Sequence, residues 1–262
     1  MVIEWNAHMF SRDREGYPFH PQATYIPDES RLLEDPLAAY LTRMDEEGID
    51  RAILVHPEPY GDDHRLILEC LEREPERLKA TSLFYPRDPE APRKLEQLVR
   101  HQPRIVATRF HGHKAYLDRF GDDGVRALWR KAGELGLIIE LHIGPQYAAQ
   151  AAEVIRTYPD FTVLVDHLGE PHTGNAVEYA DVLELARFDT VVMKLSGLGH
   201  FSTDEPLYLE ARPFTHLVVD AFGPDRMVWG GGTPAIVDTH LGHLSEKDRE
   251  KVKGDNLAYL FS

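Results

Sequence analysis

Short apolar runs rich in valine, isoleucine and leucine recur along the whole chain, separated by stretches whose apolar residues have helical spacing. The runs predict eight strands, at residues 2–6, 51–55, 79–84, 104–110, 137–142, 161–166, 190–195 and 226–230. Two segments with helical spacing are 123–135 and 147–158. Because the strand runs are apolar at successive positions, we expect strands that are buried on both faces, as in a parallel sheet covered by helices.

This alternation predicts an α/β fold, and a chain of 262 residues has the length of one closed (β/α)₈ TIM-like barrel. An open doubly wound sheet is the alternative, but no strand precedes a G-x-G-x-x-G turn or a G-x-x-x-x-G-K-[ST] loop. The proline-rich segment 86–92 lies between periodic segments and is typical of a βα loop rather than a linker. Residues 1–262 are therefore predicted to form a single domain.

Composition narrows the class of protein. The chain has 29 Lys and Arg against 44 Asp and Glu, and its net charge of −15 disfavours nucleic acid as a partner. A single cysteine, Cys70, excludes an internal disulfide and favours a reducing compartment. Residues 1–6 lack the features of a signal peptide, and no apolar run approaches the roughly 20 residues that span a membrane. We expect a cytoplasmic enzyme with no membrane partner, for which a homo-oligomer stays open.

Histidines stand at the ends of five of the eight predicted strands, where a barrel builds its active site. His8, His142 and His167 are predicted to be catalytic, because neutral imidazole can accept a proton or bind a metal near pH 7. The other histidines at strand ends are predicted to contact substrate; they are His56, His111 and His113. A structural or surface role is expected for six further histidines, namely His20, His64, His101, His216, His240 and His243.

Two cations lie at the same level of the predicted strands, Arg109 at the end of the fourth and Lys194 near the end of the seventh. A charge in an apolar strand needs a partner or access to solvent. One interpretation is an ion pair with a strand-end carboxylate such as Glu140 or Asp166. The other is that Arg109 grips a substrate carboxylate through two hydrogen bonds while Lys194 adds a second charge, which predicts a small anionic substrate.

Sequence landmarks run in order over almost the whole chain: Asn6-Ala7-His8-Met9-Phe10, Thr108-Arg109-Phe110, Glu140-Leu141-His142, Val165-Asp166-His167-Leu168-Gly169, Lys194-Leu195-Ser196-Gly197, Arg226-Met227-Val228-Trp229-Gly230 and Gly254-Asp255-Asn256-Leu257-Ala258-Tyr259-Leu260-Phe261. In these landmarks the chain resembles the amidohydrolase-related TIM-barrel family. Within it, the chain is most similar to the lactonase branch, which includes pyrone-dicarboxylate lactonase, sugar-acid lactonases and metal-independent lactone isomerases. The resemblance implies a hydrolase that acts on a lactone or a related small carboxylated compound.

The chain departs from the family pattern at two positions. The family usually opens Asp-x-His-x-His, whereas Phe10 stands here in place of the second histidine. The family usually reads Trp-Gly-Ser-Asp-Trp-Pro after the last strand, whereas Gly232 stands here in place of the aspartate. Neither residue offers a side-chain ligand, so the resemblance implies an enzyme with no cofactor. One Zn²⁺ on His8, His142 and His167 is the alternative.

Asn6 and Gly232 complete the predicted substrate contacts, with Gly232 open to two interpretations. Gly230-Gly231-Gly232 is typical of a tight turn at positive φ, and it would equally widen the pocket or expose backbone NH groups to an anion. The main hypothesis is a metal-independent lactone hydrolase. The alternatives are a lactone isomerase, a metal-dependent decarboxylase of the same family and a binding barrel without catalysis.

Overall fold

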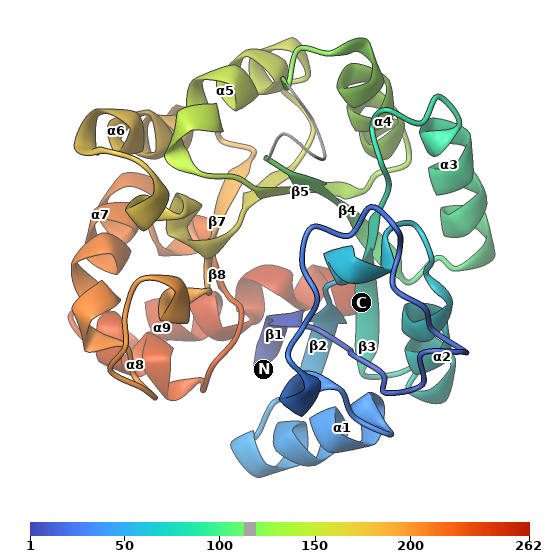
Figure 1. Ribbon diagram of the computed structural model, residues 1–262. Helices are drawn as coiled ribbons and strands as arrows, with labels where there is room; N and C mark the ends of the chain where they lie inside the picture. The colour runs from blue at the N-terminus through green and yellow to red at the C-terminus, as the bar shows by residue number, and fades with distance from the viewer. Residues whose placement is uncertain (113–118) are drawn as a thin grey trace.

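The computed structural model describes residues 1–112 and 119–262, which form one parallel sheet of eight strands in the order β1 to β8 (Figure 1). The strands are β1 Ile3–Ala7, β2 Arg51–Leu54, β3 Leu78–Leu83, β4 Ile105–His111, β5 Ile138–His142, β6 Val163–Val165, β7 Val191–Leu195 and β8 Met227–Trp229. All eight predicted strands are confirmed within two residues at each end, and the (β/α)₈ TIM-like barrel is confirmed with them. His113 lies outside the described residues.

The helices of the described residues form a ring outside the sheet (Figure 1). They are α1 Pro36–Glu47, α2 Arg65–Arg73, α3 Ala91–His101, α4 Asp123–Glu134, α5 Ala148–Thr157, α6 Ala176–Glu184, α7 Arg212–Phe222, α8 Ala235–His240 and α9 Glu246–Lys253. The two helical segments predicted at 123–135 and 147–158 are α4 and α5. Local signals explain some of the ends, since Asp35 caps α1 through the Ala38 NH and Asn175 forms a capping box at α6.

The inward side chains of the strands form layers, because alternate residues of a strand point to the same face. The lowest layer is apolar and contains Ala107, Ile138, Leu164 and Val228. Two residues further along β4 and β5 stand Arg109 and Glu140, and two residues further again stand His111 and His142. The same step leads from Leu164 to Asp166 and from Val192 to Lys194. The barrel interior therefore passes from an apolar layer through a charged layer to histidines at its mouth.

The barrel is joined between β8 and β1 by side chains, as no ladder pairing links these two strands within the described residues. Glu4 in β1 accepts hydrogen bonds from Tyr40 and Arg43 of α1. Arg43 also donates to the Gly232 carbonyl at 3.1 Å, beyond the end of β8. Gly230 approaches the Trp5 carbonyl so closely that a Cβ there would lie 2.2 Å from the oxygen. We call Glu4, Tyr40, Arg43 and Gly232 the seam.

Within residues 1–112 and 119–262, none of the helices combines the length and the apolar character needed to cross a membrane.

Candidate active site

A cavity of about 300 Å³ opens at the carboxyl ends of the strands. It is lined by Asn6, His8, Tyr25, Arg31, Glu58, Arg109, His111, His142, His167 and His200. An adjoining hollow of about 280 Å³ shares His111, His142 and His200 and adds Glu170 and His172. The structure thus brings together Asn6, Arg109 and four of the predicted histidines, from strands that are far apart in the sequence.

A larger hollow of about 650 Å³ lies among the loops that follow β1, β2 and β3. Its charged groups satisfy one another, because Lys94 bridges Asp62 at 2.9 Å and Asp88 at 2.7 Å. It holds none of the catalytic histidines predicted from the sequence. The cavity of about 300 Å³ is lined by these histidines and is the candidate active site.

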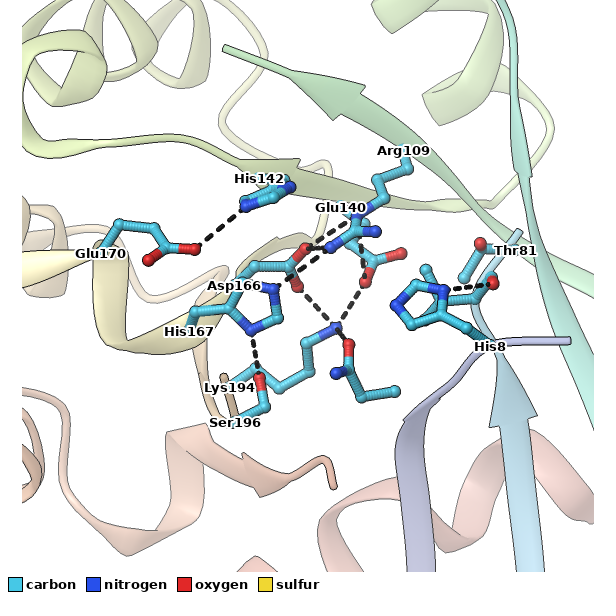
Figure 2. Close-up of polar contacts among 12 residues, drawn as sticks. His8, Thr81, Arg109, Glu140, His142, Asp166, His167, Glu170, Lys194 and Ser196 are labelled. Carbon is cyan, nitrogen blue, oxygen red and sulfur yellow. Dashed lines mark hydrogen bonds and ion pairs between the residues drawn. The ribbon is translucent and has the colours of Figure 1, made fainter. Parts of the chain in front are cut away.

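Four charged side chains form a closed network beneath the cavity, which we call the wall cluster: Arg109, Glu140, Asp166 and Lys194 (Figure 2). Arg109 donates through Nε and Nη2 to Asp166 Oδ2. Lys194 Nζ lies 2.5 Å from Glu140 Oε1 and 2.6 Å from Asp166 Oδ1. Arg109 is 3% exposed and the other three are fully buried. The two cations therefore make the ion pairs that the sequence left as an alternative.

The wall cluster contains two cations and two carboxyl groups, and burial together with these charges sets the pKa of each acid. Burial opposes ionisation of Asp166, yet the charges of Arg109 and Lys194 hold its pKa well below the ordinary value. Burial, together with the neighbouring charge of Asp166, raises the pKa of Glu140 to about 7. Lys194 does not line the cavity, whereas Arg109 does, and its Nη1 makes no hydrogen bond to any described residue.

His8 presents an unprotonated nitrogen to the cavity. Its Nδ1 lies 3.0 Å from the Val55 carbonyl, which can only accept, so Nδ1 carries the proton and Nε2 has a free lone pair (Figure 2). His8 Nε2 has no hydrogen-bond partner among the described residues. It is also absent from the fully buried polar atoms that lack a partner, so it is accessible from the cavity. Burial, and then the charges of Arg109 and Lys194, lower the pKa of His8 well below 6.5. His8 is therefore neutral at pH 7.

The other two predicted catalytic histidines are more constrained. His142 Nε2 lies 3.0 Å from Glu170 Oε1, and His142 Nδ1 is fully buried with no hydrogen-bond partner among the described residues. Burial alone would raise the pKa of Glu170, but hydrogen bonds from His142 and His200 lower it to about 2. Glu170 is therefore ionised and accepts a hydrogen bond from each of these histidines. His167 Nδ1 bonds to Ser196 Oγ at 2.7 Å, and its Nε2 faces Arg109 Nη2 at 3.4 Å.

Besides Lys194, the predicted substrate contacts His56 and Gly232 do not line the cavity formed by the described residues, and local packing explains why. His56 is fully buried, donates from Nε2 to the Gly61 carbonyl at 2.9 Å and packs against His64. Gly232 is exposed at φ 75° after Gly231 at φ 106°. This geometry is the tight turn at positive φ that was one interpretation of the glycine run.

Several lining residues were missed by the sequence reasoning: Tyr25, Arg31, Glu58, Glu170 and His200. Glu170 follows the sixth strand by a few residues, so the strand-end rule that found Asp166 would also have found it. Tyr25 and Arg31 come from the long loop between β1 and α1, which has no periodic pattern. Only the folded chain places that loop over the barrel mouth.

Of the two groups of described residues whose ligand atoms could meet at a metal ion, one is His167, Glu170 and His200, and the other suits a metal ion poorly. His142, Asp166 and His167 each offer a ligand atom, all within 4.8 Å of one another. Asp166, however, already pairs with Lys194 through Oδ1 and with Arg109 through Oδ2. The Arg109 guanidinium also faces His167 Nε2. Two fixed cations therefore occupy the ligand atoms, and a divalent ion placed there would be repelled. His8 is not part of this group.

The chain was compared with known proteins. A family model described as amidohydrolase matches residues 5–261. The chain is similar to 4-sulfomuconolactone hydrolase of Rhizobium radiobacter, with 27% identity over 93% of this chain and 78% of that protein. It is also similar to L-fucono-1,5-lactonase of Burkholderia ambifaria, with 25% identity over 94% of this chain and 84% of that protein. Both relatives are named as enzymes that hydrolyse lactones.

Solved structures share the fold. A "probable 2-pyrone-4,6-dicarboxylic acid hydrolase" from Acinetobacter baumannii, with citric acid bound, superposes with a TM-score of 0.81 at 20% identity. The similarity covers 99% of this chain and 98% of that chain. At this level of identity the likeness supports the barrel fold.

Proposed function

This chain belongs to the amidohydrolase family, and we propose that it is a lactone hydrolase that works without a bound metal ion. The names of its relatives support the reaction class. The observation that carries the proposal is the His8 tautomer, which presents a basic nitrogen at a cavity wall that also contains the Arg109 guanidinium. A base beside a cation is what hydrolysis of an ester bond requires.

The reaction follows from three groups. His8 Nε2 takes a proton from water as the water oxygen attacks the lactone carbonyl carbon. The oxyanion that forms is stabilised by Arg109 Nη1 and by the Asn6 amide, whose Oδ1 lies 3.4 Å from Lys194 Nζ and whose NH₂ group is left to donate. When the intermediate collapses, the ring C–O bond breaks, and the alkoxide receives the proton from His8. The product is the hydroxy acid, and His8 regains its neutral form.

His142 and His167 have supporting roles in this proposal. Glu170 fixes the His142 ring, and Ser196 fixes His167, so both imidazoles line the cavity in one orientation. Asp166 accepts from Arg109 and so directs the remaining guanidinium nitrogen. The wall cluster thus serves as a preorganised electrostatic support beneath the reacting carbonyl.

Metal independence rests on the same contacts. The family positions for a second histidine and an aspartate hold Phe10 and Gly232, and both Asp166 oxygens are paired with cations. In the proposed reaction the hydrogen bond from Arg109 Nη1 polarises the lactone carbonyl in place of a metal ion.

The test is a panel of γ- and δ-lactones, with and without a carboxylate substituent, assayed in H₂¹⁸O. We expect saturable turnover with one ¹⁸O incorporated into the product, unchanged after dialysis against a chelator. His8→Ala lowers kcat by about 10²- to 10⁴-fold, the usual contribution of a general base. His216→Gln is the control, because His216 bonds to the His240 carbonyl away from the cavity.

Other results would redirect the assignment. Product without ¹⁸O indicates isomerisation, release of carbon dioxide indicates decarboxylation, and tight binding without turnover indicates a binding barrel. Loss of activity when one bound zinc ion per chain is removed contradicts metal independence.

We further propose a cytoplasmic location, supported by the single cysteine, Cys70, which is buried and free.

A further inference from the structure

The charges that line the cavity are not equally available to a ligand. Arg109 is neutralised by Asp166, and Glu170 accepts hydrogen bonds from His142 and His200. Glu58 bonds through both carboxylate oxygens to the Thr24 backbone NH. Among these charged lining groups of the described residues, the Arg31 guanidinium alone has no hydrogen bond or ion pair, although the Arg31 backbone NH donates to the Asp28 carbonyl.

From this difference we propose that Arg31 is the specificity-determining residue, which binds a carboxylate attached outside the lactone ring of the substrate. The proposal rests on the lactone hydrolase function above. It replaces Arg109 and Lys194 as the anion-binding pair expected from the sequence, because the charges of those two residues are used within the wall cluster.

Arg31 is held in place by an aromatic ring. It ends the short 3-10 helix Glu29–Arg31 in the loop between β1 and α1, and its guanidinium carbon lies 4.7 Å from the centre of the Phe10 ring. Phe10 is 3% exposed and packs against Tyr60 with ring centres 6.3 Å apart. A cation above a fixed ring face is restrained in position while its NH groups stay free to donate. The position that replaces a family histidine therefore supports an arginine.

Arg31 also shares the cavity with the groups of the proposed reaction. Arg31 and His8 line the same cavity of about 300 Å³, a volume suited to a single ring with one substituent. A carboxylate on such a substituent can reach the guanidinium fork, which binds it through two parallel hydrogen bonds. The ring carbonyl then lies toward His8 and Arg109.

The kinetic test compares 5-oxotetrahydrofuran-2-carboxylate with γ-butyrolactone, which lacks the carboxylate. We expect Arg31→Gln to lower the ratio of kcat/KM for the carboxylated over the neutral lactone at least tenfold, mainly through KM. Arg31→Lys recovers part of the ratio, since it keeps charge but not the fork. Phe10→Leu raises KM for the carboxylated lactone about two- to fivefold, the size of an exposed cation–π contact. Arg12→Gln is the matched control, because Arg12 lies in the same loop and pairs with the exposed Glu34.

A binding measurement separates this proposal from the proposed function. The probe is 3-oxocyclopentane-1-carboxylate, which has a ring carbonyl but no hydrolysable bond, titrated by calorimetry. Binding to the native protein that weakens at least tenfold in Arg31→Gln and not in Arg12→Gln supports the Arg31 site, even if no lactone is hydrolysed. Equal affinity for native and Arg31→Gln proteins, or no binding to the native protein, overturns it.

Discussion

Two charge clusters of the described residues, the wall cluster and the seam, differ in burial and in what they face. The wall cluster, built on β4 to β7, lies directly beneath the cavity and balances two cations against two carboxylates. The seam, between β8 and β1, pairs Glu4 with Arg43 and Tyr40 of α1, and the Arg43 side chain is 33% exposed. One cluster supports a reaction site, and the other ties the first strand to the last.

This difference explains the two departures from the family pattern. Gly232 belongs to the seam, where its carbonyl accepts from Arg43, and Phe10 supports Arg31. Both positions thus make structural contacts, while the groups that we propose to act on substrate are His8, Arg109, Asn6 and Arg31. The absence of metal ligands at Phe10 and Gly232 is therefore compatible with a reaction that depends on other side chains of the barrel mouth.

The largest expected effect comes from breaking the wall cluster. Lys194→Met leaves Glu140 and Asp166 buried with only Arg109 for compensation, so the free energy of unfolding falls by about 3–5 kcal/mol. Urea unfolding followed by circular dichroism measures it. Lys247→Met, at an exposed position, is the control and changes the value by less than about 0.5 kcal/mol. A loss of under about 1 kcal/mol in Lys194→Met contradicts the role of the cluster.

A smaller loss is expected at the seam. Arg43→Met removes the hydrogen bonds to Glu4 and to the Gly232 carbonyl, but water reaches this site, so the free energy of unfolding falls by about 1–2 kcal/mol. The same urea experiment measures it. If Arg43→Met and Lys194→Met prove equally damaging, the two clusters do not differ as described.

Replacing Gly232 of the seam with the aspartate of the family pattern tests whether this position can be returned to metal binding. Gly232→Asp places a side chain at φ 75°, next to the end of the Ile236 side chain, and costs about 1 kcal/mol of stability. Combined with Phe10→His, it is expected to yield no zinc-dependent hydrolysis, because Arg109 and Lys194 still occupy Asp166. Gly232→Ala separates backbone strain from charge. A zinc-dependent gain in kcat/KM would show that the two departures alone removed a metal centre.

The smallest expected effect is on the pH profile. The proposed base is neutral His8, and burial lowers its pKa well below 6.5. Since only the deprotonated ring accepts a proton, a lowered pKa moves the acid limb of the profile to lower pH. We expect the acid limb that His8 causes in the kcat/KM profile to lie below pH 6.5, apart from any change near pH 7 as Glu140 ionises. If Glu140→Gln removes a limb near pH 7 and leaves the one below pH 6.5, the two groups are separated; a profile with no limb below pH 6.5 contradicts His8 as the base.

The amino-acid pattern alone was sufficient for the barrel and for most of the residues at its mouth. Successive apolar positions mark strands buried on both faces, and parallel strands bring their carboxyl ends together. His8, Arg109, His142 and His167 were predicted for that reason, and the structure places all four on one cavity. Strand order and strand ends are local properties of the chain, so local patterns are enough to find them.

What each side chain does at the mouth was decided by tertiary contacts. Arg109 and Lys194 had two interpretations until the structure showed both Asp166 oxygens paired with them. Arg31 had no signal at all, because a loop without periodicity reaches the cavity only when the chain is folded. Burial, charge compensation and the choice of partner depend on residues distant in sequence. The sequence therefore determined where the chemistry lies, and the three-dimensional packing determined which charges are free to meet a substrate.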